Sequence, residues 1–133
     1  KDQIFIAAMR YLLRDFRKVV LRAYLTTPDR AEAIIKASFA KTHFDPGAVA
    51  AWMAFYAQAQ TNPEARRLLS LYQRRLRSNL THALRGQVAD PSDVADLLAA
   101  LIDGFYIRRA LADPKTDAAG QVLSLLKTLR VAH

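Results

Sequence analysis

Residues 90–106 read DPSDVADLLAALIDGFY, and this stretch indicates how the chain folds. Asp90-Pro91 puts a capping side chain directly before a proline at the first helical position, where the missing proline N–H costs nothing. Residues 97–102 are then apolar without interruption, so a helix here cannot have one fully solvated side. The stretch predicts a helix covered on both faces, either at the centre of a monomeric bundle or at a contact with a second copy.

The same combination of a polar residue followed by proline recurs along the chain. Asp45-Pro46 and Asn62-Pro63 predict helix starts, Thr27-Pro28 predicts another, and Asp113-Pro114 closes one helix before the next opens near Thr116. Glycine is scarce, whereas alanine, leucine, arginine and glutamine favour helix at nearly every position. We therefore expect an all-α, six-helix bundle, with helices at about residues 2–25, 28–41, 46–60, 63–85, 91–111 and 117–132.

Composition limits the class of protein. A chain of 133 residues with 52% hydrophobic residues suits one domain. Cysteine is absent, which excludes disulfides and thiolate metal sites and suits a cytoplasmic location. The net charge of +8 fits attraction to nucleic acid, attraction to an anionic membrane, or an arginine-rich solvated surface. Arginines crowd the segment 63–85 outside its apolar stripe, among them Arg66, Arg67, Arg74, Arg75 and Arg77.

The sequence offers no catalytic constellation. His43, in a predicted loop, His82 and His133 have no partner at metal-ligand spacing and read as surface or capping residues. The four glycines stand singly, so a phosphate-binding loop is not indicated. We expect no catalytic residue, no metal and no cofactor, and hence no enzyme.

The aromatic residues are the most informative candidates for a site. Trp52, Phe55 and Tyr56 share a helix face, and Tyr11, Tyr72 and Tyr106 lie on other predicted helices that could converge on it. Aromatic rings can hold a quaternary ammonium group, which has no N–H to donate. Asp103 interrupts an apolar run and is the candidate counter-charge. Alternatively, the aromatic residues are core and Asp103 faces solvent or a helix partner.

The last two predicted helices carry more apolar surface than one chain requires, which predicts a symmetric homodimer. The residues expected at its interface are Leu97, Leu98, Leu101, Ile102, Phe105, Val122, Leu125, Leu126 and Leu129.

Three segments resemble the C-terminal region of BetI-type repressors of the TetR family. They are residues 6–13 (IAAMRYLL), residues 52–56 (WMAFY) followed by 75–80 (RLRSNL), and residues 98–108 (LAALIDGFYIR). Tyr56 and Tyr106 stand where tryptophan is expected in the nearest members. Residues 1–4 resemble the junction that follows the helix-turn-helix in that family. The resemblance implies a ligand-binding and dimerisation domain whose DNA-binding domain is absent from this numbering.

The resemblance also implies a function: repression of the genes that convert choline to glycine betaine, with release from operator DNA by choline. The ligand is then expected among Trp52, Phe55, Tyr56 and Tyr106, with Asp103 as counter-charge. Two alternatives stay open. One is a TetR-type regulator for another amphipathic or drug-like ligand. The other is a standalone helical adaptor that presents the basic segment 63–85 to an acidic partner.

Overall fold

The chain is described by a computed structural model that covers residues 2–111 and 117–132. Those residues form seven α-helices and no strand. The helices are α1 (Asp2–Thr26), α2 (Arg30–Ser38), α3 (Lys41–Phe44), α4 (Pro46–Ala59), α5 (Pro63–Leu84), α6 (Pro91–Ala110) and α7 (Ala118–Ala132). The all-α prediction is confirmed. The count of six was wrong, because Lys41–Phe44 forms a helical turn of its own between α2 and α4.

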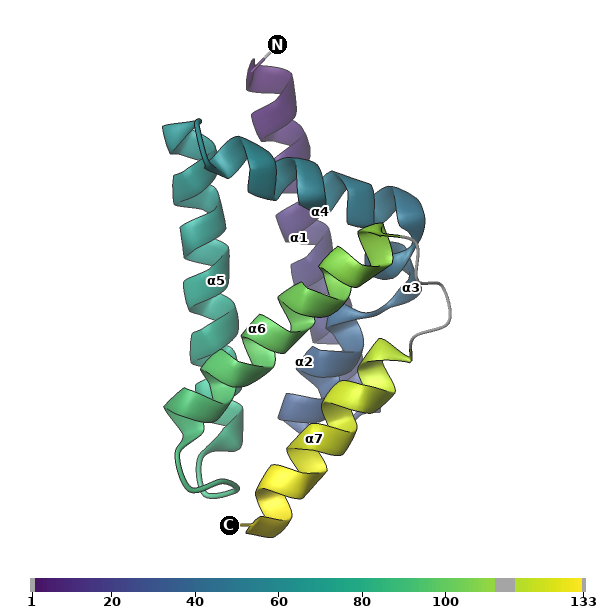
Figure 1. Cartoon of the computed structure of the whole chain (residues 1–133), viewed down its shortest axis with the longest axis vertical. Coiled ribbons are helices and arrows are strands. Elements are labelled where there is room, and N and C mark those ends of the chain that lie inside the picture. The colour runs from purple at the N-terminus through teal and green to yellow at the C-terminus, as the bar shows by residue number, and fades with distance from the viewer. Residues whose placement is uncertain (1, 112–116, 133) are drawn as a thin grey trace.

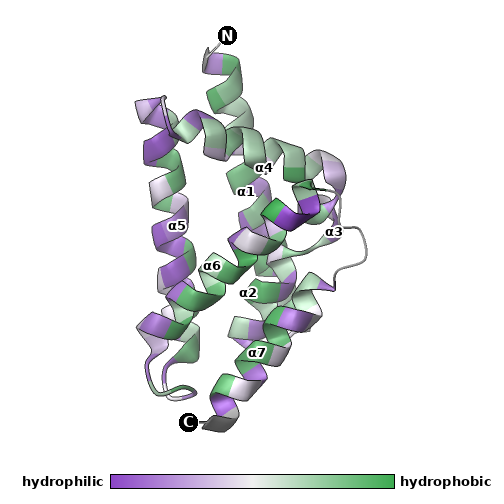
Figure 2. Ribbon diagram, viewed as in Figure 1, coloured by the Kyte–Doolittle hydropathy of each residue, from purple (hydrophilic) through white to green (hydrophobic). Residues whose placement is uncertain are grey.

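The two longest helices, α1 and α5, run side by side in the same direction, and α4 passes in front of α1 and ends beside the start of α5 (Figure 1). α6 runs obliquely across the bundle and packs against α4 and α5, whereas α7 packs against α2 and α6. Hydrophobic residues cover much of α6 and α7, while the outer edge of α5 is hydrophilic (Figure 2). The bundle therefore has one strongly basic helix edge and, on the other side, two helices rich in apolar residues.

Three of the predicted helix starts are confirmed. The Asp45 carboxylate accepts the Ala48 N–H at 2.8 Å, and the Asn62 and Asp90 side chains accept backbone N–H groups at the starts of α5 and α6. Each bond satisfies a donor that helix geometry leaves without an intrahelical acceptor. The start at Thr27-Pro28 was wrong, since α2 begins at Arg30 with Asp29 as its N-cap. Asp113-Pro114 and Thr116 lie outside the described residues.

Asp29 has a second role that fixes α7 in place. Its carboxylate pairs with the Arg130 guanidinium at 2.7 Å, and both side chains are largely buried. One residue thus caps α2 and anchors the last helix, which explains why the helix starts here rather than at the preceding proline.

Side chains of α6 also terminate two short helices. The Tyr106 hydroxyl donates to the backbone carbonyl of Ser38, the last residue of α2. The Arg109 guanidinium donates to the carbonyl of Phe44, the last residue of α3, at 3.2 Å. Carbonyls at helix C-termini have no intrahelical donor, so α6 supplies the donors that these two ends need.

Candidate functional site

Aromatic side chains from three helices meet around Trp52, and we call Trp52, Phe55, Tyr56, Tyr72 and Tyr106 the aromatic cluster. The Trp52 ring centroid lies 5.9 Å from that of Phe55 in a stacked arrangement and 5.1 Å from that of Tyr72. Tyr56 and Tyr106 are each 6.2 Å away, with the Tyr106 ring nearly perpendicular to the indole. The predicted convergence of these five residues is found in the structure, with α4 contributing three of them, α5 one and α6 one.

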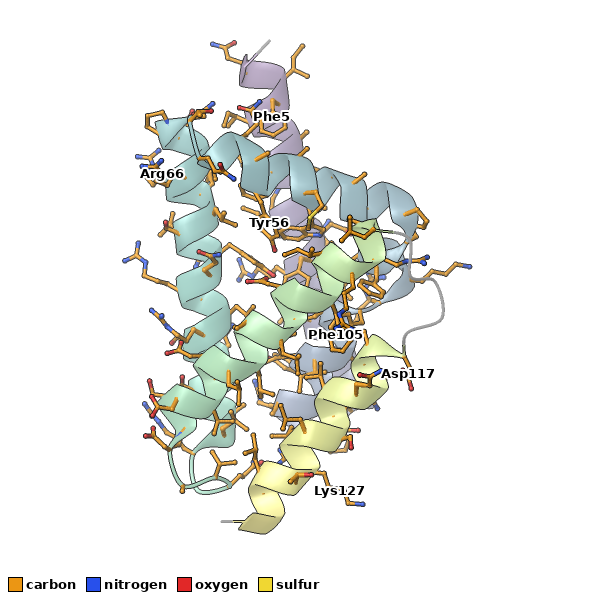
Figure 3. The ribbon with its side chains drawn as sticks, in the orientation of Figure 1. Phe5, Tyr56, Arg66, Phe105, Asp117 and Lys127 are labelled. Carbon is orange, nitrogen blue, oxygen red and sulfur yellow. The ribbon has the colours of Figure 1, made fainter. Side chains whose placement is uncertain are left out.

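The members of the aromatic cluster differ in exposure. Trp52, Phe55 and Tyr106 are buried, whereas Tyr56 and Tyr72 are half-buried. Figure 3 shows Tyr56 beneath α4, directed toward the space between α5 and α6. Burial raises the pKa of both Tyr56 and Tyr72 above the ordinary tyrosine value, so both hydroxyls stay neutral at physiological pH. The half-buried tyrosines give the cluster its access to solvent.

Asp103, on α6, places a carboxyl group beside the aromatic cluster. Its carboxylate accepts a hydrogen bond from the Tyr56 hydroxyl at 3.2 Å and is half-buried. Within residues 2–111 and 117–132 it forms no ion pair with lysine, arginine or histidine. Burial raises the pKa of the Asp103 carboxyl, while the Tyr56 hydrogen bond opposes that change. A cation placed beside Asp103 would relieve the desolvation of this carboxylate.

The indole of Trp52 also has unused hydrogen-bonding capacity. Its Nε1–H is buried and has no acceptor in the described part of the chain. The Tyr106 hydroxyl, by contrast, is already engaged with Ser38. Buried donors normally have a partner, so the Trp52 N–H is an exception among the described residues.

His43 was predicted to be a loop residue at the surface or at a cap, and this was wrong. It lies on α3, is fully buried, and its Nε2 is 2.9 Å from an Asp15 carboxylate oxygen on α1. Its ring packs edge-on against Phe16 and lies 6.3 Å from Trp52 between centroids. Burial lowers the pKa of His43, against the opposing effect of Asp15. His43 therefore links the aromatic cluster to α1 as a neutral imidazole.

Tyr11 does not join the aromatic cluster, which corrects that part of the predicted site. It is 67% exposed on α1. It is adjacent in sequence to Leu12, which packs against the core, and successive residues of a helix point about 100° apart, which turns Tyr11 toward solvent.

The residues predicted at a dimer interface divide into two groups. Leu98, Ile102, Phe105, Val122 and Leu126 are buried in the core of the chain itself; Figure 3 labels Phe105, which lies inside the bundle. This corrects the prediction for those five, because a side chain already enclosed by its own chain has no surface to offer. Leu97 is 49% exposed, and Leu101, Leu125 and Leu129 are half-buried. An interface made by α6 and α7 would have to use these four.

Two other kinds of site can be assessed from the same structure. Over the described residues, no group of three histidine, cysteine, aspartate or glutamate side chains is arranged to hold a metal ion. In that same part of the chain, none of the helices is long and apolar enough to cross a membrane.

Comparisons with known proteins define the class. The fold matches a crystal structure of a transcriptional regulator from Pseudomonas aeruginosa PAO1, with a TM-score of 0.69 and 24% sequence identity over 96% of this chain and 64% of that one. Residues 28–130 match the family described as BetI-type transcriptional repressor, C-terminal. The chain therefore belongs to the BetI-type repressors of the TetR family, as its sequence predicted, and the family is one of transcriptional regulators rather than enzymes.

Curated relatives agree with this assignment. The chain is 46% identical to the HTH-type transcriptional regulator BetI of Rhizobium meliloti over 84% of its own length. It is 44% identical to the protein of the same name from Agrobacterium fabrum and 39% identical to that from Brucella abortus. It spans 57%, 56% and 64% of those three proteins, so this chain corresponds to somewhat more than half of each.

Proposed function

We propose that this chain is the effector-binding and dimerisation domain of a repressor of choline-to-glycine-betaine genes, and that choline is its effector. The observation that carries the proposal is the half-buried Asp103 carboxylate, which contacts the aromatic cluster and has no cationic partner among the described residues. A quaternary ammonium group supplies the missing charge without needing a hydrogen-bond acceptor. Aromatic faces such as those of Trp52 and Tyr56 then contribute about 0.5–2 kcal/mol each.

The same residues favour choline over its oxidation product. Choline carries one positive charge and a hydroxyl group, whose oxygen could accept the unused Trp52 N–H. Glycine betaine carries a carboxylate as well, and this would lie close to the Asp103 carboxylate at an unfavourable Coulomb energy. A sensor with this arrangement responds to the substrate of the pathway rather than to its product.

Calorimetric titration of choline and of glycine betaine into the 133-residue chain tests the proposal. Wild type should bind choline and bind glycine betaine about tenfold more weakly or less. Asp103→Asn keeps the acceptor for Tyr56 but removes the charge, so choline affinity should fall about tenfold or more. Trp52→Phe should weaken binding by about 1 kcal/mol because phenylalanine is a weaker cation–π partner.

Circular dichroism of each variant serves as the control for folding. The assignment is wrong if choline at millimolar concentration does not bind the folded wild-type chain, or if wild type, Asp103→Asn and Trp52→Phe bind it equally. Affinity should also decrease as the pH is lowered through the raised pKa of Asp103, since the protonated acid no longer attracts the cation.

Dimerisation is the second part of the proposal, and its support is the outer apolar face of α6 and α7. Leu97 and Ile107 on α6 are about half exposed, at 49% and 50%, and Leu101, Leu125 and Leu129 lie on the same two helices. Sedimentation at micromolar concentration should give twice the chain mass. Leu97→Glu together with Leu129→Glu should give the monomer mass, while Leu25→Glu, on exposed α1 surface, should leave the dimer intact.

Control of transcription requires that the effector prefer one arrangement of the two DNA-binding domains, since equal binding to both would shift nothing. The relatives are named HTH-type regulators and are longer than this chain. We therefore assign operator recognition to a helix-turn-helix outside these residues. The 133-residue chain alone should bind DNA only in a salt-sensitive, sequence-independent way, and sequence-specific binding that survives high salt would contradict this.

A further inference from the structure

A groove between α1 and α5 is not lined by Asp103 and has a different character from the aromatic cluster. Its volume is about 590 Å³, within the range of small-molecule sites. Apolar side chains from both helices line it, among them Leu13, Val20, Leu68 and Leu76. Leu21 and Leu71 also line it and are 52% and 42% exposed. The groove therefore presents an accessible apolar surface that the chain does not itself cover.

The rim of this groove is positive. Arg14, Arg17, Arg30 and Arg75 line it, and no aspartate or glutamate does. None of these four arginines forms an ion pair in the described ranges of the chain. The Arg30 guanidinium lies over the Tyr24 ring, 4.6 Å from its centroid, which holds the charge in a defined place.

A second hollow of about 520 Å³ continues from the groove, and Tyr24, Arg30 and Asn79 line both. Apart from Ala83, its remaining lining is polar and basic, with Arg74, Arg77 and Arg85 beside serine, threonine and histidine side chains. Arg77 forms an exposed ion pair with Asp96 at 3.4 Å. The apolar groove thus adjoins a hydrogen-bonding, positively charged hollow, and Arg30 lines both.

We infer that this groove binds a single-chain amphiphile with a phosphate head group. The alkyl chain would lie between α1 and α5, and the phosphate would sit at the junction with the polar hollow, where Arg30 can donate two parallel hydrogen bonds to its oxygens. A nucleic acid backbone does not suit an apolar floor. A second copy of this face, with the same arginines, would be repelled. The inference does not depend on choline as effector.

Calorimetry with dodecyl phosphate, kept below its micellar concentration, tests the inference on the 133-residue chain. Dodecyltrimethylammonium and dodecyl maltoside are the matched probes, since they have the same alkyl chain with a cationic or an uncharged head. Dodecyl phosphate should bind saturably with one site per chain, and the other two should bind about tenfold more weakly or less. Equal binding of all three would show a surfactant effect and overturn the inference.

Matched variants locate the site. Arg30→Gln and Arg75→Gln should each weaken dodecyl phosphate about tenfold or more through loss of a charged hydrogen bond. Arg67→Gln, on the same helix α5 but lining neither hollow, should not. Leu71→Asp should abolish binding, while Leu25→Asp should leave it unchanged. Circular dichroism confirms folding of each variant.

Dodecyl phosphate binding by the Asp103→Asn variant distinguishes the groove from the aromatic cluster. Asp103→Asn should leave dodecyl phosphate affinity unchanged whether or not choline binds. If Arg67→Gln weakens dodecyl phosphate as much as Arg30→Gln and Arg75→Gln do, general charge attraction explains the binding and the groove assignment is wrong.

Discussion

The aromatic cluster and the α1–α5 groove are neighbours with opposite properties. The aromatic cluster is closely packed, and among the described residues the acidic group hydrogen-bonded to it is the Asp103 carboxyl. The groove is open, and its charged lining consists of arginines. Tyr72 belongs to the aromatic cluster and also lines the groove, so the two regions share a wall. A net charge of +8 therefore says little about which ligand either region prefers, because ligand preference depends on the charges in contact.

The largest expected difference between the two regions is in stability. Trp52→Ala removes a buried indole and should lower the free energy of unfolding by about 3–5 kcal/mol. Leu71→Ala, in the exposed groove, should cost far less because much of its side chain already contacts water. Chemical denaturation measures both, with Leu25→Ala as the surface control. Equal losses for Trp52→Ala and Leu71→Ala would show that the aromatic cluster is not the better packed region.

A second difference should appear on acidification. Because the pKa of His43 is lowered in the folded state, the unfolded chain takes up its proton first as the pH falls below about 6.5. The stability contributed by neutral His43 is thus present above that pH and is lost as the pH falls toward the folded pKa. His43→Gln should cost about 1–3 kcal/mol at pH 7.5 and should flatten the decline between pH 7 and 5. An unchanged decline would assign it to other groups.

Asp103 should give a smaller effect with the opposite sign. Its folded-state pKa is raised, so the folded protein binds its proton more tightly and the carboxylate costs stability once the pH exceeds that pKa. Asp103→Asn should therefore raise the free energy of unfolding at pH 7, by less than about 1 kcal/mol because the group is partly solvated. Denaturation at pH 7 and pH 4 checks this, as the gain should shrink in acid. A loss of stability at pH 7 would mean that the charge is already compensated.

The smallest effect is expected on the groove rim. Arg17→Gln should change the free energy of unfolding by no more than about 0.5 kcal/mol, because Arg17 forms no ion pair in the described residues. Thermal melts of this variant and of Arg67→Gln should coincide. A marked loss with Arg17→Gln alone would show that the rim is structural rather than available to a ligand.

Local signals made much of the fold predictable. The caps at Asp45, Asn62 and Asp90 act within three residues, so the sequence placed those helix starts correctly. The start of α2 depends on Asp29, which caps the helix by accepting the Glu32 N–H and also pairs with Arg130, 101 residues away. The spacing of apolar residues near position 29 contains no sign of that contact.

In the candidate site, too, local features were predictable from the sequence and long-range contacts were not. The helix face shared by Trp52, Phe55 and Tyr56 follows from their spacing, and the segment around Asp103 resembles the family. Burial of His43 could not be read from its neighbours, since a histidine between Thr42 and Phe44 is not part of an apolar stripe. Its partner Asp15 lies on α1. The burial of such a residue depends on its contacts with other helices and not on the periodicity of apolar residues around it.

The two bonds that α6 donates to the ends of α2 and α3 limit how the bundle can deform. Sliding α6 along its axis would pull the Tyr106 hydroxyl from Ser38 and the Arg109 guanidinium from Phe44 at the same time. α2, α3 and α6 should therefore move together, because these two hydrogen bonds connect them. Because His43 on α3 is hydrogen-bonded to Asp15 at 2.9 Å, α2, α3 and α6 are also connected to the middle of α1. A displacement of α6 is thus coupled to α1 through three side-chain hydrogen bonds as well as through the packed core.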